Sequence, residues 1–316
     1  MPMAYRSILR KQIIFLVGPT AIGKTEVAVY LAKRIGAQII SSDSMQVYKG
    51  MNIITSKPKP ALRKKIKHYL INTVPIARNY DVSSYRHDAL KKVKEIIARG
   101  KVPIFVGGTG LYMSILVDGI FKGKVKDEDI RKKFYKIAQA KSSGYLYKRL
   151  KKVDPEASGK IHPNDTKRII RALEVFEAAG KPISMLQKER HGLRDEYDVR
   201  IFCLNTERAK LYKRIDERVE RMFKQGLINE VKKLLKRRLS ETASCAIGIR
   251  EVKGYLSGGY GLEEAKGMIK LNTRHYAKRQ LTWFRKDKRI KWVNIKDKET
   301  PQSVAKRIHK LWRELS

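Results

Sequence analysis

The sequence predicts an α/β fold in which a parallel sheet is flanked by helices and interrupted by an all-helical insertion. Short apolar runs alternate with helical patterns up to residue 113 and again after residue 198, as is typical of buried parallel strands joined by crossover helices. Between residues 114 and 198 only helical periodicity remains. We therefore expect a core formed by residues 1–113 and 199–316, with a helical domain at 114–198.

The first apolar run, residues 13–17, leads into a glycine-rich segment, and a helical pattern follows at 26–35. The segment at 18–25 matches the phosphate-binding pattern G-x-x-x-x-G-K-[ST]. Between a strand and a helix, its backbone N–H groups face an anion. The core is thus predicted to be P-loop NTPase-like, and the residues expected to hold a phosphorylated ligand are Gly18, Pro19, Thr20, Ala21, Ile22, Gly23, Lys24 and Thr25. Lys24 is expected over the terminal phosphate and Thr25 on Mg²⁺.

The composition favours a nucleic-acid partner. The 316 residues include 71 Lys and Arg against 31 Asp and Glu, a formal charge of +40. A generic surface mixes both signs, so this excess indicates a polyanion, with RNA or DNA ahead of a membrane.

Cysteine usage and hydropathy indicate a soluble, cytoplasmic protein. Cys203 and Cys245 form neither a disulfide framework nor a zinc spacing, as expected in a reducing compartment. The N-terminus lacks a signal-peptide pattern, and no run approaches the roughly 20 apolar residues of a membrane span.

Asp43 follows the second apolar strand, residues 37–42. The carboxyl ends of parallel strands form the edge where α/β proteins bind ligands. Asp43 is either a site carboxylate, a cap of the following turn, or a magnesium ligand through water. After a crossover helix and a third strand at 103–106, a second glycine-rich turn at 107–110 reaches the same edge. Such a turn is more often a tight connection than a ligand loop.

The helix expected at 166–179 in the insertion has two unlike faces. Asn164 or Asp165 provides its N-cap. One face is apolar, and Lys167, Arg168 and Arg171 lie on the other. That basic face either follows a nucleic-acid backbone or is simply solvated.

The chain returns to the sheet at 199–204 and continues as a long basic helical stretch. Arg214, Arg218 and Arg221 recur at spacings of four and three, so they face one direction and either clamp a diphosphate or coat a solvent face. In the basic stretch at 278–285, Trp283 and Phe284 either stack on unpaired bases or anchor the last strand, 290–295.

Taken together, these segments resemble the tRNA dimethylallyltransferase family, the tRNA isopentenyl-modifying enzymes. The resemblance covers nearly the whole chain and rests on residues 18–25, 43–51, 106–112, 162–165, 168–174 and 278–283. Two positions depart from the family pattern: Ile54 stands where a glycine is usual, and Ile249 replaces an aromatic residue. We expect the first to change local turn geometry and the second to change an RNA-facing contact.

The resemblance implies transfer of a dimethylallyl group from dimethylallyl diphosphate to N6 of adenosine 37, next to the tRNA anticodon. Asp43 would be the general base, and Thr109 would contact the target nucleotide. Lys24, Mg²⁺ on Thr25 and Arg218 would stabilise the diphosphate. A monomer is expected. The positions implied for tRNA binding are Asp43, Ser44, Met45, Gln46, Thr109, Arg131, Lys167, Arg168, Ile169, Ile170, Arg171, Cys245, Ala246, Ile247, Gly248, Ile249, Arg250, Lys278, Arg279 and Gln280.

Three alternatives remain open from the sequence. A small-molecule or nucleoside kinase would share the phosphate loop and bind ATP there, but has no need of the cationic excess. An adenylate isopentenyltransferase would act on a free nucleotide. A non-catalytic RNA-binding protein would retain the loop without turnover, against which the joint presence of Lys24, Thr25 and Asp43 speaks.

Overall fold

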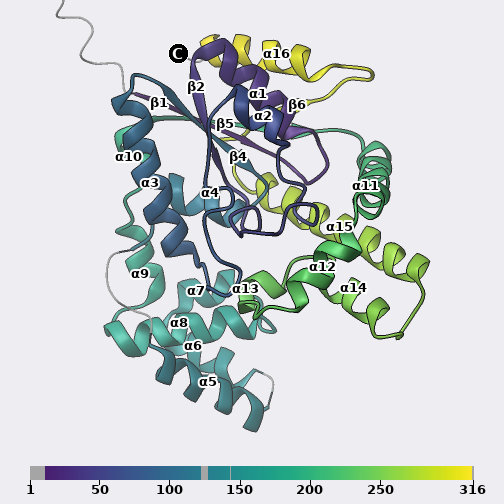
Figure 1. Ribbon diagram of the computed structural model, residues 1–316. Coiled ribbons are helices and arrows are strands. Elements are labelled where there is room, and N and C mark those ends of the chain that lie inside the picture. Colours follow the sequence, from purple (N-terminus) through teal and green to yellow (C-terminus); the bar gives the residue numbers. More distant parts are fainter. Residues whose placement is uncertain (1–10, 122–126, 143, 315–316) are drawn as a thin grey trace, which may run out of the picture. The chain divides into compact units, whose positions relative to one another are not determined.

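The computed structural model describes residues 11–121, 127–142 and 144–314 (Figure 1). Contacts divide the chain into two compact units. The core unit comprises Met1–Val117 and Glu196–Ser316, and the insertion comprises Asp118–Asp195. The sequence placed these boundaries at 114 and 198, a few residues away. Each unit is described by itself.

The core unit is built on a six-stranded sheet with the order β3-β2-β4-β1-β5-β6, and every pairing is parallel. The α/β class predicted from the sequence is therefore confirmed. The strands are β1 (Gln12–Val17), β2 (Ala37–Ser41), β3 (His68–Tyr69), β4 (Val102–Gly107), β5 (Asp198–Asn205) and β6 (Lys291–Asn294). Only β3, which is two residues long, had no counterpart in the sequence prediction.

The register aligns the carboxyl ends of the central strands. Val17 of β1 pairs with Gly107 of β4 and Cys203 of β5, and Ser41 of β2 pairs with Val106 of β4. The segments that follow β1, β2 and β4 therefore leave the sheet at one edge, where a site is expected.

Buried apolar residues hold this sheet between helices. Residues 13–16 of β1 are fully buried, and Phe15 stacks on Phe105 with ring centroids 4.5 Å apart. Helix α16 packs beside α1 near the top of Figure 1. The helices lying within the core unit are α1 (Lys24–Ile35), α2 (Pro60–Lys65), α3 (Val82–Ala98), α4 (Gly110–Val117), α11 (Arg208–Lys224), α12 (Leu227–Leu235), α13 (Glu241–Ser244), α14 (Ile249–Leu256), α15 (Leu262–Arg285) and α16 (Pro301–Glu314).

The insertion is helical, as the sequence predicted, with one isolated β-bridge among its described residues, between Ile120 and His191. Its core gathers around α8, whose Ile169 and Leu173 pack with Phe134 and Leu150. Its helices are α5 (Glu128–Ala140), α6 (Tyr145–Val153), α7 (Pro155–Lys160), α8 (Thr166–Ala179), α9 (Ile183–Lys188) and α10 (Leu193–Glu196), the last of which runs one residue into the core unit.

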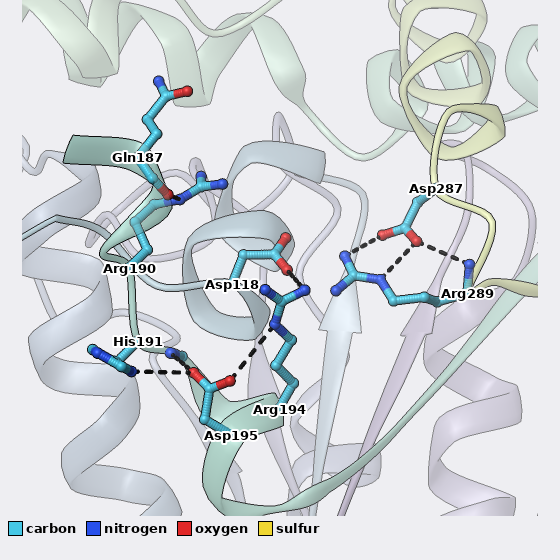
Figure 2. A network of polar contacts seen from close by, with 9 residues as sticks. Asp118, Gln187, Arg190, His191, Arg194, Asp195, Asp287 and Arg289 are labelled. Atoms are coloured by element: carbon cyan, nitrogen blue, oxygen red, sulfur yellow. Dashed lines mark hydrogen bonds and ion pairs between the residues drawn. The ribbon is translucent and has the colours of Figure 1, made fainter. Parts of the chain in front are cut away.

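Ion pairs join the two ends of the insertion (Figure 2). Arg194 contacts Asp118 at 3.0 Å and Asp195 at 3.8 Å, so one guanidinium links the first and last residues of the unit. Beside it, Gly119 has φ +82°, and a Cβ there would lie 2.1 Å from the His191 carbonyl oxygen. The entering and leaving chains thus approach so closely that Gly119 has to be glycine.

Candidate active site

The predicted phosphate loop connects β1 to α1 and curls through left-handed backbone conformations. Gly18, Ala21 and Gly23 have φ values of +144°, +64° and +95°. A Cβ on Gly18 would also lie 2.7 Å from the Leu204 carbonyl oxygen, so conformation and space both demand glycine. Lys24 folds back over the loop, and its Nζ donates to the carbonyl oxygens of Gly18 at 2.9 Å and Pro19 at 2.7 Å.

Arginines from α11 reach the same loop. Arg218 donates through Nη1 to Thr20 Oγ1 at 2.9 Å, and Arg214 donates to the Ile22 carbonyl oxygen at 3.3 Å. Both line one cavity with Arg221 and Lys24, which agrees with the common direction that their spacing predicts. These partners are uncharged, so the loop gathers cationic groups whose charge is available to an anion.

Burial perturbs the acidity of these cations. It lowers the pKa of Lys24 to about 8, an effect that Arg218 reinforces and Asp43 opposes. Burial also lowers the pKa of Arg218. Buried cations with perturbed pKa values are common at functional sites. A bound anion would favour their charged forms and so offset the cost of burying them.

The cavity has a volume of about 840 Å³ and is lined by the loop, Asp43, Gly107, Gly108 and Tyr276. This volume lies within the usual range for small-ligand sites. The predicted carboxylate and the predicted phosphate loop therefore open into one space within the core unit.

Asp43 is fixed by the turn that it caps. Its Oδ1 accepts from the backbone N–H groups of Met45 at 2.9 Å and Gln46 at 3.3 Å. The capping interpretation is thus correct for one oxygen, while the residue also lines the cavity. Thr109 lies close by, since its Oγ1 accepts from Ser44 N at 3.2 Å.

The glycines of the second turn allow neighbouring segments to approach. A Cβ on Gly107 would lie 1.9 Å from the Ser42 carbonyl oxygen, and one on Gly110 would lie 2.2 Å from Trp283 Cδ1. The turn is therefore the tight connection that the sequence allowed for. Phe284 is fully buried and Trp283 packs on the turn, so both anchor α15 to the core, although Trp283 remains 37% exposed.

Two cavity-lining side chains of α15 contribute in ways that the sequence did not reveal. Gln280 is 6% exposed; its Oε1 accepts from Thr20 N at 2.9 Å, and its Nε2 donates to the Gly108 carbonyl oxygen at 2.9 Å. Tyr276 lies one turn earlier. Burial and the charge of Asp43 raise the pKa of Tyr276 to about 12, which hydrogen bonding with Thr109 and Gln280 partly opposes. The four-residue spacing of Tyr276 and Gln280 was the available signal.

The segment after Asp43 is held by Lys57 and Glu230, which the sequence also did not single out. Lys57 Nζ donates to the Tyr48 carbonyl oxygen and to Asn72 Oδ1, and burial lowers the pKa of Lys57 to about 8. The Glu230 carboxylate accepts from three consecutive backbone N–H groups that end at Ile54. These bonds fix the turn in which Ile54 departs from the family pattern.

Several residues assigned to tRNA have side chains that are buried in the described structure. Ile249 is 4% exposed, so its departure from the family pattern lies in the core and not at an RNA-facing surface. The tRNA-assigned residues with buried side chains are Ile169, Ile170, Ala246, Ile249 and Gln280. Gly248 is also buried, with φ +108°.

The remaining tRNA assignments are at least partly accessible. Exposed are Cys245, Arg250, Lys167, Arg168, Lys278 and Arg279, and partly exposed are Asp43, Ser44, Met45, Gln46, Thr109 and Ile247. Arg131 and Arg171 are also partly exposed, but both pair with the buried carboxylate of Glu174, at 2.9 and 3.0 Å. Arg168 also pairs, with Asp165 at 3.3 Å, but that carboxylate is not buried. On the predicted basic face, the charge of Arg171 is therefore the one engaged by a buried carboxylate.

The cavity has few protein ligands for a metal. Among the described residues, no three His, Cys, Asp or Glu side chains gather to hold an ion. Thr25 lies in the first turn of α1 and lines the cavity with Asp43. This sparse oxygen donor set fits Mg²⁺, which commonly takes one or two protein oxygens and completes its shell with substrate phosphates and water. Within the described residues, no helix is long and apolar enough to cross a membrane.

Comparison with known proteins shows which family this chain belongs to. Residues 46–287, more than half of the chain, match the sequence profile of the family described as IPP transferase. The chain belongs to this family. As an IPP transferase, it is 45% identical over 286 residues to the tRNA dimethylallyltransferase of Geobacter sulfurreducens, covering 90% of this chain and 92% of that protein. A Thermotoga maritima protein of the same name is 45% identical over 282 residues, with coverages of 88% and 90%.

Solved structures agree with the IPP transferase assignment. The crystal structure of a tRNA isopentenylpyrophosphate transferase from Bacillus halodurans has a TM-score of 0.72 and 37% identity, covering 96% of each chain. A eukaryotic dimethylallyltransferase acting on tRNA has a TM-score of 0.83 at 28% identity, covering 96% of this chain and 79% of that one. The similarity thus extends over both units of the chain.

Proposed function

We propose that this IPP transferase transfers the dimethylallyl group of dimethylallyl diphosphate to N6 of the adenosine just 3′ of a tRNA anticodon, position 37. One observation carries the proposal: the cationic loop and Asp43 line a single cavity. Thr109 follows the cavity-lining Gly108, and its Oγ1 accepts from the N–H of Ser44, the residue next to Asp43. Relatives named tRNA dimethylallyltransferase support the choice of donor and acceptor. The products are N6-dimethylallyladenosine and diphosphate.

The loop and α11 act on the leaving group. The allylic C–O bond breaks with its electron pair moving to the diphosphate, so negative charge grows on the phosphate oxygens. Lys24, Arg214 and Arg218, together with the loop N–H groups, lie where they can stabilise that charge.

Thr25 is the residue we propose for Mg²⁺, either directly or through water. The ion would neutralise part of the diphosphate charge. Lys24 and Arg218 supply the same kind of stabilisation from the protein itself, so the loss of any one cation should weaken the reaction without abolishing donor binding.

Asp43 acts on the acceptor. The exocyclic amine of adenine is a weak nucleophile because its lone pair is delocalised into the ring, so its proton must leave as the C–N bond forms. The two N–H groups that bind Oδ1 orient the carboxylate, and we assign Oδ2 as the oxygen that takes the proton. The Thr109 hydroxyl accepts from Ser44 N and hydrogen-bonds Tyr276. We propose that the target base takes the place of Tyr276 as the acceptor of the Thr109 proton.

The basic surfaces offer contacts to the RNA backbone. An adenosine stacked in an anticodon loop must be flipped out to enter the cavity, which costs a few kcal/mol. Exposed cations can offset this cost at phosphates: Lys278, Arg279 and Arg285 on α15, and Lys167 and Arg168 on α8. We also propose a monomeric, cytoplasmic enzyme, because one chain supplies the whole cavity and both cysteines are free.

A donor experiment tests this function. The protein is incubated with bulk tRNA or with AMP, and with either allyl-labelled dimethylallyl diphosphate or γ-labelled ATP. We expect allyl label in tRNA alone. Phosphate label in any acceptor would indicate a kinase, allyl label in AMP an adenylate isopentenyltransferase, and tRNA binding without transfer a non-catalytic RNA-binding protein.

A further inference from the structure

Gln280 is the side chain that spans the donor and acceptor halves of the cavity. Thr20 lies 260 residues away in sequence and Gly108 lies 172 away, yet both bonds to Gln280 are 2.9 Å long. The side chain is almost fully buried, and its amide is engaged by these two backbone groups.

Both contacts are tightly constrained. A Cβ on Gly108 would lie 2.0 Å from Gln280 Nε2, so the turn packs directly on the amide. At the other end, Thr20 N belongs to a loop whose N–H groups surround the proposed diphosphate, and Gln280 Oε1 holds that N–H.

Hydrogen bonds extend this connection to the catalytic carboxylate. Gly108 precedes Thr109, whose Oγ1 accepts from Ser44 N, and Ser44 follows Asp43. A path of hydrogen bonds and short peptide segments therefore runs from the phosphate loop through Gln280 to Asp43.

The helix that carries Gln280 is firmly packed and can hold this side chain in a fixed place. Helix α15 runs unbroken over 24 residues. On either side of Gln280, Ala277 and Phe284 are fully buried, while Trp283 packs on Gly110. Gln280 is thus carried by a rigid support and not by a loop.

We propose that Gln280 is a positioning residue that sets the phosphate loop against the Gly107–Thr109 turn, so that diphosphate in the loop also orders the turn beside Asp43. This inference rests on the proposed function for its meaning, although the coupling itself is a property of the two segments. By reciprocal linkage, a ligand that orders the phosphate loop should also order the Gly107–Thr109 turn, and a ligand that orders the turn should order the loop.

Amide hydrogen exchange with inorganic diphosphate tests the coupling without any turnover. In the wild type, diphosphate should slow exchange in segment 18–27 and also in segment 105–113. In Gln280→Met, which removes both hydrogen bonds at similar side-chain length, protection should be confined to 18–27. Gln280→Glu keeps an acceptor for Thr20 N but no donor for the Gly108 carbonyl oxygen, so it should also lose protection at 105–113 while preserving the shape of the core.

The matched control is His275→Met, an exposed position on the same helix, which should behave as the wild type. Equal protection of 105–113 in the wild type and both Gln280 variants would overturn the proposal, as would a wild type that protects only 18–27. If the wild type protects neither segment, the donor site itself is wrong, and the proposed function falls with the inference.

Steady-state kinetics add a second criterion. Misplacement of reacting groups by about 1 Å can cost a hundredfold in rate, so kcat of Gln280→Met per folded enzyme should fall about a hundredfold. Its KM for dimethylallyl diphosphate and for tRNA should stay within threefold. A raised KM for tRNA at unchanged kcat would mean that Gln280 is an RNA contact after all, and unchanged kcat and KM would reduce it to a core residue.

Discussion

The cations of the core cavity and the arginines around Glu174 in the insertion have different kinds of partner. In the core cavity, Lys24 and Arg218 bond to carbonyl and hydroxyl oxygens. In the insertion, Arg131 and Arg171 pair with the buried carboxylate of Glu174. The charges of Lys24 and Arg218 remain available to a ligand. The charges of Arg131 and Arg171 are neutralised by a buried carboxylate and stabilise the fold. A cation's partner, more than its presence, therefore separates a binding site from a structural network.

The largest effect is expected at the carboxylate that faces the cavity cations. Asp43→Ala should lower kcat by about 10² to 10⁴, the usual contribution of a general base. The affinity for tRNA should stay within a few-fold, because phosphate contacts dominate binding. Single-turnover rates and filter binding measure the two quantities. Near wild-type turnover at saturating substrates would remove Asp43 from the role of base.

Removing the cavity cations should come next. Lys24→Ala should slow transfer a hundredfold to a thousandfold, since a contact that strengthens in the transition state contributes about 2.7–4 kcal/mol. Thr25→Ala should weaken diphosphate binding and slow transfer, and chelation of Mg²⁺ should reproduce both effects. Single-turnover rates at several concentrations of dimethylallyl diphosphate measure them. Lys213→Ala, an exposed lysine on α11, is the control and should be silent. Transfer that survives a strong chelator would exclude the metal.

In the insertion, the corresponding change should affect stability instead of catalysis. Glu174→Ala leaves two arginines without their carboxylate and should destabilise the protein by about 3 kcal/mol, the lower range for breaking a buried pair. Glu177→Ala, an exposed pairing residue, should cost less than about 1 kcal/mol. Chemical denaturation followed by a probe in the insertion measures both. Equal losses would contradict the distinction between the two networks.

The same pair predicts an acid dependence. Burial raises the pKa of Glu174, but hydrogen bonds from Arg131, Arg171 and the Asp127 amide lower it more, so the net pKa lies below 4.5. The pairing therefore stabilises the fold fully above the unfolded value, and that stabilisation is lost as the pH falls through the folded value. The difference in unfolding free energy between the wild type and Glu174→Gln should shrink below pH 4.5. A constant difference down to pH 3 would mean that ionisation of Glu174 is irrelevant.

The salt dependence of tRNA binding should show the smallest but most selective change. Neutralising Lys167 and Arg168 together should reduce the slope of log K against log salt by roughly 1.4–1.8, or 0.7–0.9 for each lost phosphate contact. Arg171→Ala should leave the slope nearly unchanged, because its charge is already paired. The measurement is tRNA affinity across a salt series. If Arg171→Ala changes the slope as much as the double variant does, its pairing with Glu174 does not persist on RNA.

The local part of the site was predictable from sequence, and the part that depends on tertiary contacts was not. The phosphate loop and Asp43 were readable because both stand directly after buried strands. The direction shared by Arg214 and Arg218 followed from helical spacing. The bonds of Gln280 could not be predicted, because its partners Thr20 and Gly108 are distant in the chain.

Two other features were missed for different reasons. The two-residue strand β3 is too short to show a period, and it forms because it pairs with β2. The pairing of Arg171 with Glu174 left a visible signal, an opposite charge three residues along the helix. The sequence could not show that this glutamate is buried, which decides that the charge of Arg171 is used internally.

The proposed reaction is tested most directly by finding which nucleotide of the RNA receives the dimethylallyl group. The wild-type protein is incubated with dimethylallyl diphosphate and an anticodon stem-loop, and the RNA is digested and mapped by mass spectrometry. We predict a single added dimethylallyl group on N6 of the adenosine 3′ of the anticodon, and none when that adenosine is replaced by guanosine. A modified base at any other position, or an unmodified RNA under conditions in which both substrates bind, would contradict this prediction.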